Sequence, residues 1–299
     1  TNGAYESDSV SEIWNGVPLA MQLKVLLEQE SRYQPKLSGL RVLEAAHDSG
    51  LRMTSRLRDF EVKDLLSLTR FFGFSTETFS LAVNLLDRFL ALMKVIQPKH
   101  LSCVGLCCFY IAVKSTEEER NVPLAHDLIR ISQNRFTVSD MIRMEKIILE
   151  KLCWRVKAPT AMSFLRLYHS YILEHLDMEI RKALNMERLE AQLKACHCSF
   201  IFSKVKPSLL SLATLLLEVQ EQGLHSAAGD LQCLQQHSNG DLVCVRELVA
   251  KCLTEYSSTK RFKPNNQKLR WIISGRTARQ LKHSYYKIAH LPTIPEASC

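Results

Sequence analysis

The run Glu77-Thr-Phe-Ser-Leu-Ala-Val-Asn-Leu-Leu-Asp-Arg-Phe-Leu90, which continues through Leu101 to Glu118, predicts two buried helices in succession. In the first helix, leucine and phenylalanine recur at the three-to-four spacing of one helical face, and Thr76-Glu77-Thr78 offers an N-cap with an acidic first turn. The second run, Leu101–Val113, is apolar on nearly every face. About 13 such residues are too few to span a bilayer, so we expect the enclosed central helix of a soluble helical bundle.

Two charged residues interrupt this apolar sequence. Asp87 lies near the end of the first predicted helix and Lys114 near the end of the second. A charge held against a core needs a partner, because desolvating an isolated ion costs several kcal/mol. The candidate partners are Arg58 and Arg88 for Asp87, and Glu145 for Lys114.

The charged residues and their neighbours resemble a cyclin box in order and spacing. The matching features are Leu57-Arg58 at the start of an amphipathic helix, Leu-Ala-Val-Asn-Leu-Leu-Asp87-Arg-Phe, Ala-Val-Lys114 and Arg-Met-Glu145. Four charged positions in register over about 100 residues are far more specific than a single short motif. The segments Leu26–Gly73 and Leu189–Cys198 resemble the G-type cyclins in particular.

The resemblance implies an all-α fold of two tandem five-helix cyclin boxes. The expected domains are an N-terminal segment with one helix at 1–56, a first cyclin box at 57–157, a second cyclin-box-like domain at 158–257, and a basic tail at 258–299. The two halves share too little sequence to establish a repeat from residues alone, so the repeat is implied only by the resemblance.

Capping and breaking residues predict where the helices lie. The expected ranges are 58–72, 77–93, 98–114, 122–131 and 137–151 in the first half, and 160–174, 186–203, 207–221, 226–236 and 241–256 in the second. Pro18 suits the start of an N-terminal helix, Gly73 the end of the first box helix, and Thr137 with Asp140 a capping box.

Composition narrows the class of protein. The 299 residues are 46% hydrophobic and 23% charged, which is enough for two modest cores. No run of about 18 apolar residues is present and residues 1–16 lack the pattern of a signal peptide, so we expect no membrane partner. Most of the ten cysteines lie in apolar helical runs, Cys103, Cys107, Cys108, Cys153 and Cys252 among them, and we expect reduced core thiols.

The sequence contains no catalytic or metal-binding pattern that we recognise. A glycine-rich phosphate loop, a Gly-x-Ser-x-Gly elbow and a His-Glu-x-x-His pair are all absent. Cys196-His197-Cys198 brings together possible metal ligands, but successive helical positions point about 100° apart and cannot close on one ion. We therefore expect a non-enzymatic protein without a metal or cofactor.

The resemblance implies a kinase-binding site. In cyclins, the residues that match Lys114 and Glu145 contact the backbone around the regulatory helix of a cyclin-dependent kinase, and those that match Leu149, Trp154 and Val156 add apolar contacts. Arg58 and Asp87 match an internal structural ion pair. From the residues alone, a stabilising ion pair of a helical bundle is the better explanation of Lys114 and Glu145, and only the resemblance favours the kinase-binding role.

Two segments depart from the cyclin pattern. Kinase-activating cyclins follow the lysine with an aromatic residue and two acids, whereas this chain has Lys114-Ser-Thr-Glu117, which predicts a weaker kinase contact. The apolar patch by which cell-cycle cyclins dock substrates corresponds to Phe60-Glu-Val-Lys-Asp64, with acids at two positions. We therefore predict weak or absent docking of Arg-x-Leu peptides.

The C-terminal segment carries a second candidate site. Leu291-Pro-Thr-Ile294-Pro-Glu296 resembles the docking motif read by B-prime regulatory subunits of protein phosphatase 2A. The prolines favour an extended backbone, from which Leu291 and Ile294 offer apolar anchors and Glu296 a carboxylate. The alternative is a chance match in a solvated terminus.

The net charge of +8 belongs to the tail, where nine Lys or Arg residues after Thr259 face one acid, Glu296. The tail has no stacking platform for bases, so nucleic acid is not an expected partner.

We therefore expect a cyclin-type regulatory adaptor in cell-cycle control, in the nucleus and cytoplasm, that recruits protein phosphatase 2A, with a cyclin-dependent kinase as second candidate partner. Two alternatives stay open: a conventional kinase activator, and a cyclin-fold transcription factor that binds nucleic acid through its basic tail.

Overall fold

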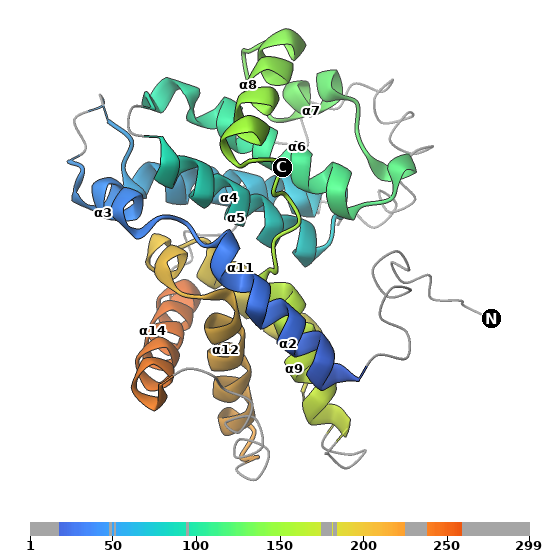
Figure 1. Ribbon diagram of the computed structural model, residues 1–299, viewed down its shortest axis with the longest axis vertical. Coiled ribbons are helices and arrows are strands. Elements are labelled where there is room, and N and C mark those ends of the chain that lie inside the picture. The colour runs from blue at the N-terminus through green and yellow to red at the C-terminus, as the bar shows by residue number, and fades with distance from the viewer. Residues whose placement is uncertain are drawn as a thin grey trace, which may run out of the picture.

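The computed structural model describes residues 18–258, apart from 48–49, 51, 94–95, 175–180, 182–183 and 225–237. The described residues form α-helices, short 3-10 helices and connecting turns, with no strand among them. Figure 1 shows two groups of helices stacked on one another. The predicted all-α fold is confirmed for this part of the chain.

The first group consists of five helices built around α6. They are α4 (Ser55–Phe72), α5 (Thr76–Leu92), α6 (Leu101–Thr116), α7 (Ala125–Ile131) and α8 (Val138–Lys151). Helix α6 contacts α4, α5 and α8, and Cys107, Phe109 and Ala112 on it are fully buried. The expectation of an enclosed central helix is therefore confirmed.

The second group consists of α9 (Ala161–Glu174), α11 (Met186–His197), α12 (Pro207–Glu221) and α14 (Asn239–Ser258) among the described residues. The helix predicted at 226–236 lies outside them. These helices enclose a second hydrophobic core, which includes Phe164, Leu193 and Leu212. The domain boundaries proposed from the sequence stay predictions.

The N-terminal helix α2 (Leu19–Glu30) packs on the second group of helices and lies alongside α9 in Figure 1. Leu23 enters the second core. The buried carboxylate of Glu30 accepts hydrogen bonds from the backbone N–H and the hydroxyl of Ser208, at 2.7 and 2.9 Å. Because Ser208 belongs to the first turn of α12, where N–H groups have no partner within the helix, Glu30 satisfies one of these N–H groups and fixes α2 to that helix.

Local sequence explains most helix ends. Thr137 and Asp140 form the predicted capping box of α8. Gly73 ends α4 with a φ of 70°, which glycine adopts without steric cost. The N-cap of α5 is Ser75, whose side chain accepts from Thr78 N, so the predicted cap one residue later was wrong.

Two further expectations need correction. The helix predicted at 186–203 ends at His197 and is followed by a separate 3-10 turn at Phe200–Lys204, because Cys198 and Ser199 turn the chain back to the first group of helices. Cys153 was predicted in the core but is exposed, because it lies in a turn after α8. No described helix is long and apolar enough to cross a bilayer.

Candidate functional site

Lys114 and Glu145 form an ion pair between α6 and α8. Lys114 lies in the last turn of α6, where a cation is favourable because the carbonyl end of a helix is negative. Its Nζ atom also lies 4.5 Å from the centroid of the Tyr110 ring, one turn earlier. The lysine side chain is 39% exposed, so ammonium hydrogens remain available for another molecule.

One face of α8 continues this surface. Ile142 and Leu149 lie three residues before and four residues after Glu145, which places all three on the same side of the helix. Ile142 is 60% exposed, whereas Leu149 is half-buried against the first core. The surface around the ion pair is therefore partly apolar.

The turn after α8 presents Trp154. Cys153 and Trp154 have φ angles of 53° and 59°, a left-handed conformation that costs energy for residues other than glycine. The turn is held by a 2.9 Å hydrogen bond from Trp154 N to Leu149 O. As a result the indole is 67% exposed, while Val156 packs against the first core.

The three residues after Lys114 make hydrogen bonds with other parts of the same chain. The Ser115 hydroxyl donates to Ile111 O at 2.7 Å, and the Thr116 hydroxyl donates to Ala112 O at 2.8 Å. The Glu117 carboxylate accepts from Ser75 N at 2.9 Å, at the start of α5. This segment therefore offers neither an aromatic side chain nor a free acid beside the Lys114–Glu145 pair.

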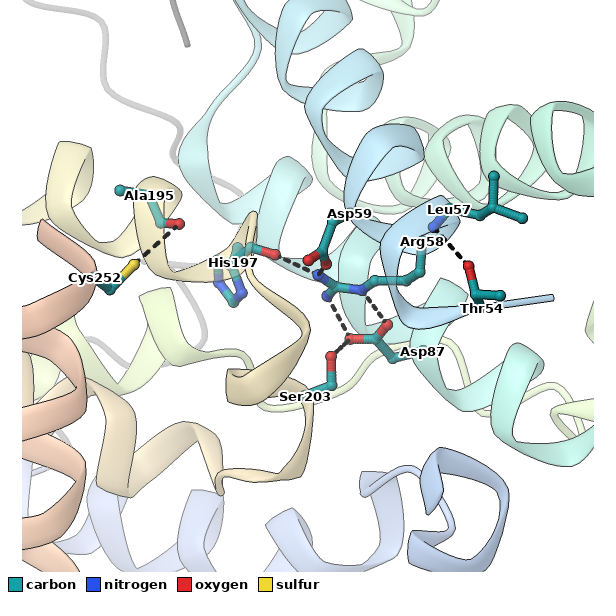
Figure 2. Close-up of polar contacts among 9 residues, drawn as sticks. All are labelled: Thr54, Leu57, Arg58, Asp59, Asp87, Ala195, His197, Ser203 and Cys252. Carbon is teal, nitrogen blue, oxygen red and sulfur yellow. Dashed lines mark hydrogen bonds and ion pairs between the residues drawn. The ribbon is translucent and has the colours of Figure 1, made fainter. Parts of the chain in front are cut away.

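Arg58 and Asp87 meet in the interior, as Figure 2 shows. The guanidinium donates to both carboxylate oxygens of Asp87, from Nε at 2.8 Å and from a terminal nitrogen at 2.7 Å. The other terminal nitrogen donates to the His197 carbonyl at 2.8 Å, and the Ser203 hydroxyl donates to Asp87 at 2.8 Å. His197 ends α11 of the second group, and Ser203 lies in the 3-10 turn between α11 and α12, so the ion pair joins the two groups.

The His197 side chain lies in the same joint. Its Nε2 atom is 3.0 Å from the Ser80 hydroxyl, and its ring meets the Phe79 ring edge-on at 5.8 Å. Burial and the charge of Arg58 lower the pKa of His197 to about 4, so the ring is neutral at pH 7. Within the described ranges, no three His, Cys, Asp or Glu side chains are grouped to hold a metal ion.

The structure thus brings together two of the predicted sets of residues. Lys114, Glu145 and Leu149 lie close to one another on the α6–α8 surface, followed by the turn that carries Trp154 and Val156. Arg58 and Asp87 form the buried pair. The proposed phosphatase-docking residues Leu291, Ile294 and Glu296 lie outside the described residues.

The sequence analysis missed Tyr110, Ile142 and Ser203, and it considered His197 only as a possible metal ligand and not as a partner of Arg58. Helical spacing could have found the first two, because Tyr110 precedes Lys114 by four residues and Ile142 precedes Glu145 by three. His197 and Ser203 carry no such signal, because each is more than 100 positions from its partner in the chain.

Comparison with known proteins bears on the family. The family described as cyclin, N-terminal domain, matches residues 22–157. Cyclin-G1 of Homo sapiens is 71% identical over 281 residues, covering 93% of this chain and 95% of that protein. Cyclin-G2 of Mus musculus is 51% identical over 287 residues, covering 95% of this chain and 83% of that protein.

A solved structure supports the same fold. The X-ray structure of a viral cyclin from herpesvirus saimiri superposes with a TM-score of 0.62 at 20% identity, covering 80% of this chain and 100% of the viral chain. At this low identity the viral structure supports the fold alone. The two cyclin-G relatives identify the subgroup. The chain therefore belongs to the cyclin family, in its G-type subgroup, and is a cyclin-type regulator in the cell cycle.

Proposed function

We propose that this chain is a non-enzymatic adaptor that holds a cyclin-dependent kinase on its α6–α8 surface and recruits protein phosphatase 2A through its C-terminal tail. The observation that carries the kinase part is the exposed Lys114–Glu145 pair, together with the exposed Trp154 in the turn that follows the helix of Glu145. A surface pair of this kind contributes little to stability. Trp154 combines a strained left-handed backbone with an exposed apolar side chain. Both features are more favourable on a surface that a partner covers than on one that faces solvent.

The kinase contact would be made mainly by three chemical groups. The Lys114 ammonium donates to carbonyl oxygens of the partner, Glu145 accepts from its N–H groups, and Trp154 supplies buried area. Binding to the kinase conformation in which the catalytic ion pair is assembled would shift the kinase towards that conformation. Ser115, Thr116 and Glu117 use their polar groups in hydrogen bonds within the chain, so we expect weak activation and favour an adaptor over a conventional activator.

The phosphatase contact is supported by the spacing of Leu291, Ile294 and Glu296 between prolines. An extended segment with two apolar anchors and one carboxylate suits a B-prime subunit that reads short peptides. The prolines reduce the entropy lost on binding, since they restrict the free segment. We propose that the adaptor acts in both the nucleus and the cytoplasm.

The experiment is affinity purification of three variants of the full chain from cells, followed by immunoblotting. Lys114→Ala with Glu145→Ala should lose the kinase and keep the phosphatase. Leu291→Ala with Ile294→Ala should lose the phosphatase and keep the kinase. The matched control is Lys204→Ala with Glu44→Ala, which removes another exposed lysine–glutamate pair and should keep both partners.

Each half of the proposal fails separately. Undiminished phosphatase recovery with the tail variant would remove the docking motif from the proposed function. Kinase recovery equal to wild type from the Lys114 and Glu145 variant would leave that pair as a stabilising contact only. Strong activation of a purified cyclin-dependent kinase by the wild-type chain would favour the conventional activator.

A further inference from the structure

Two cysteines of the second group of helices lie together where α11 packs on α14. Cys196 is fully buried in the second core, and Cys252 is half-buried against it. Figure 2 shows the Cys252 sulfur pointing towards α11, where it lies 4.0 Å from the carbonyl oxygen of Ala195. The two thiols also share a hydrogen bond. Their sulfur atoms are therefore neighbours, although the residues come from different helices.

The hydrogen bond gives the two thiols different reactivity. It lowers the pKa of Cys252, because the Cys196 S–H group stabilises a negative charge on the Cys252 sulfur. The same hydrogen bond, followed by burial, raises the pKa of Cys196. Cys252 therefore forms the thiolate more readily, and it is also the more exposed of the two. A reachable thiolate beside a second thiol that can react with its oxidised form is typical of a redox-sensitive pair.

A second pair of thiols shows why the placement on two helices matters. Cys103 and Cys107 also share a hydrogen bond, but both belong to α6. Residues four apart on one helix have Cβ atoms about 5–6 Å apart, whereas a disulfide needs about 3.5–4.5 Å. A bond between Cys103 and Cys107 would distort α6. Side chains on two packed helices are free of this restriction, because their separation is not fixed by one helical turn.

Cys198 is a competing thiol, because it follows Cys196 by two residues. Its charged neighbours include Arg58, Asp59 and Lys63, all on α4, so it faces the first group of helices rather than α14. Burial is the main cause that raises the pKa of Cys198 to about 11. We therefore expect Cys198 to remain a thiol when Cys252 is oxidised.

We propose that Cys196 and Cys252 form a redox modification site, at which hydrogen peroxide converts the two thiols into a disulfide that links α11 to α14. The Cys252 thiolate attacks one peroxide oxygen, the O–O bond breaks, and the sulfur becomes a sulfenic acid. The hydroxide that leaves takes up the proton that Cys252 has lost. The Cys196 sulfur then attacks the Cys252 sulfur, the S–O bond breaks, and the oxygen leaves as water with the Cys196 proton. Two thiols and one peroxide thus give one disulfide and two waters, and the two electrons pass from the sulfurs to the peroxide.

The disulfide attaches α14 to the joint between the two groups of helices. Cys196 directly precedes His197, whose carbonyl oxygen accepts from Arg58 at 2.8 Å. The bond also closes a long loop, which lowers the entropy of the unfolded chain and stabilises the folded one. Neither cysteine belongs to the α6–α8 surface or to the tail, so the modification is independent of the proposed kinase and phosphatase contacts.

The test treats the full, reduced chain with a small excess of hydrogen peroxide at pH 7.5. Remaining thiols are blocked with N-ethylmaleimide, and unreduced tryptic peptides are mapped by mass spectrometry. We expect a cross-linked peptide that joins Cys196 to Cys252 within one molecule, and dithiothreitol should remove the link by thiol–disulfide exchange. The midpoint of thermal unfolding should rise by at least about 5 °C on oxidation.

Four variants complete the design. Cys252→Ser and Cys196→Ala should each lose both the link and the peroxide-dependent rise in the midpoint, while circular dichroism of the reduced proteins reports whether the fold is intact. The matched control is Cys244→Ser, which removes an exposed thiol on the same helix and should form the link as wild type does. Cys198→Ala should also keep the link. Because one tryptic peptide carries both Cys196 and Cys198, this variant assigns the linked residue.

Several results would overturn the proposal. A link from Cys252 to Cys198, or one found only between two molecules, would show that Cys196 is not the second thiol. Sulfinic acid on Cys252 without a link would show that Cys196 does not react with the sulfenic acid. The same rise in the unfolding midpoint in Cys252→Ser would show that peroxide acts elsewhere, and an unchanged midpoint in the linked wild type would contradict the stabilising effect.

Discussion

The substitution Asp87→Asn tests whether the buried ion pair holds the two groups of helices together. Asp87 is 4% and Arg58 1% exposed, so the guanidinium cannot turn to solvent when its partner loses its charge. The amide replaces one accepting oxygen by a donating nitrogen, opposite either an Arg58 N–H or the Ser203 hydroxyl. Breaking a buried pair by removing one partner costs about 3–5 kcal/mol.

The lower part of this range applies here. Arg58 keeps a second carboxylate, Asp59, at 3.1 Å, and keeps the His197 carbonyl at 2.8 Å. The Asp59 side chain is 26% exposed, so solvent screens it in part. We therefore expect a loss of about 3 kcal/mol in the free energy of unfolding for Asp87→Asn.

Urea unfolding followed by circular dichroism measures this loss. The matched control is Glu44→Gln, which breaks the exposed pair with Lys204 and should cost less than about 1 kcal/mol. Because the Asp87 joint connects the two groups, its loss should also broaden the transition and lower the apparent m-value. A loss below about 1 kcal/mol with an unchanged m-value would refute this account of the joint.

Three further outcomes follow from the structure. Glu61 has a pKa of about 8 in the folded chain against a usual value of 4.5, so it binds more protons when folded and the free energy of unfolding of the wild type should fall as pH rises. In urea unfolding this fall should be about 1.4 kcal/mol per pH unit between pH 5 and 7, and Glu61→Gln should abolish it. Equal pH slopes for the wild type and the variant would contradict this. Gly39→Ala should lower the free energy of unfolding by about 1–3 kcal/mol, since the added Cβ would lie 1.9 Å from the Ala91 carbonyl oxygen; unchanged thermal unfolding would count against that close approach. An Arg-x-Leu peptide should bind less than about twofold more tightly than its Arg-x-Ser counterpart in fluorescence anisotropy, and micromolar affinity for the former would show that an apolar floor exists after all.

Local signals account for the parts of the fold that the sequence predicted. The Thr137–Asp140 capping box and the left-handed Gly73 depend only on residues within one helical turn. The central helix was recognisable because an apolar surface on all sides of a short helix leaves burial as its only stable placement. Glu145 was a candidate partner of Lys114 from the residues alone, but the proposed role of the pair in binding a kinase came only from the family pattern, since an exposed pair has no physical signature of its own in a sequence.

The remaining features depend on contacts between distant segments. Arg58 donates to the His197 carbonyl oxygen, and the two residues are 139 positions apart in the chain. The sequence around either residue does not predict that contact. The left-handed turn at Cys153 and Trp154 was missed because neither residue is glycine. The burial of Glu61 was missed because the space for its side chain depends on Gly105, which lies on another helix. The sequence around Glu61 does not indicate that Gly105 lies next to it.

Two ion pairs of the first helical group show how burial decides whether a pair contributes to stability or to binding. Arg58 and Asp87 use their donors and acceptors on the chain itself, including the second group of helices, so their loss is expected to appear as unfolding. Lys114 is 39% exposed and has donors left over, so its loss should leave unfolding almost unchanged and appear only when a partner is present. Glu61 is the third case: it is buried like Asp87, but burial raises its pKa to about 8, so its carboxyl group is largely protonated and uncharged at pH 7.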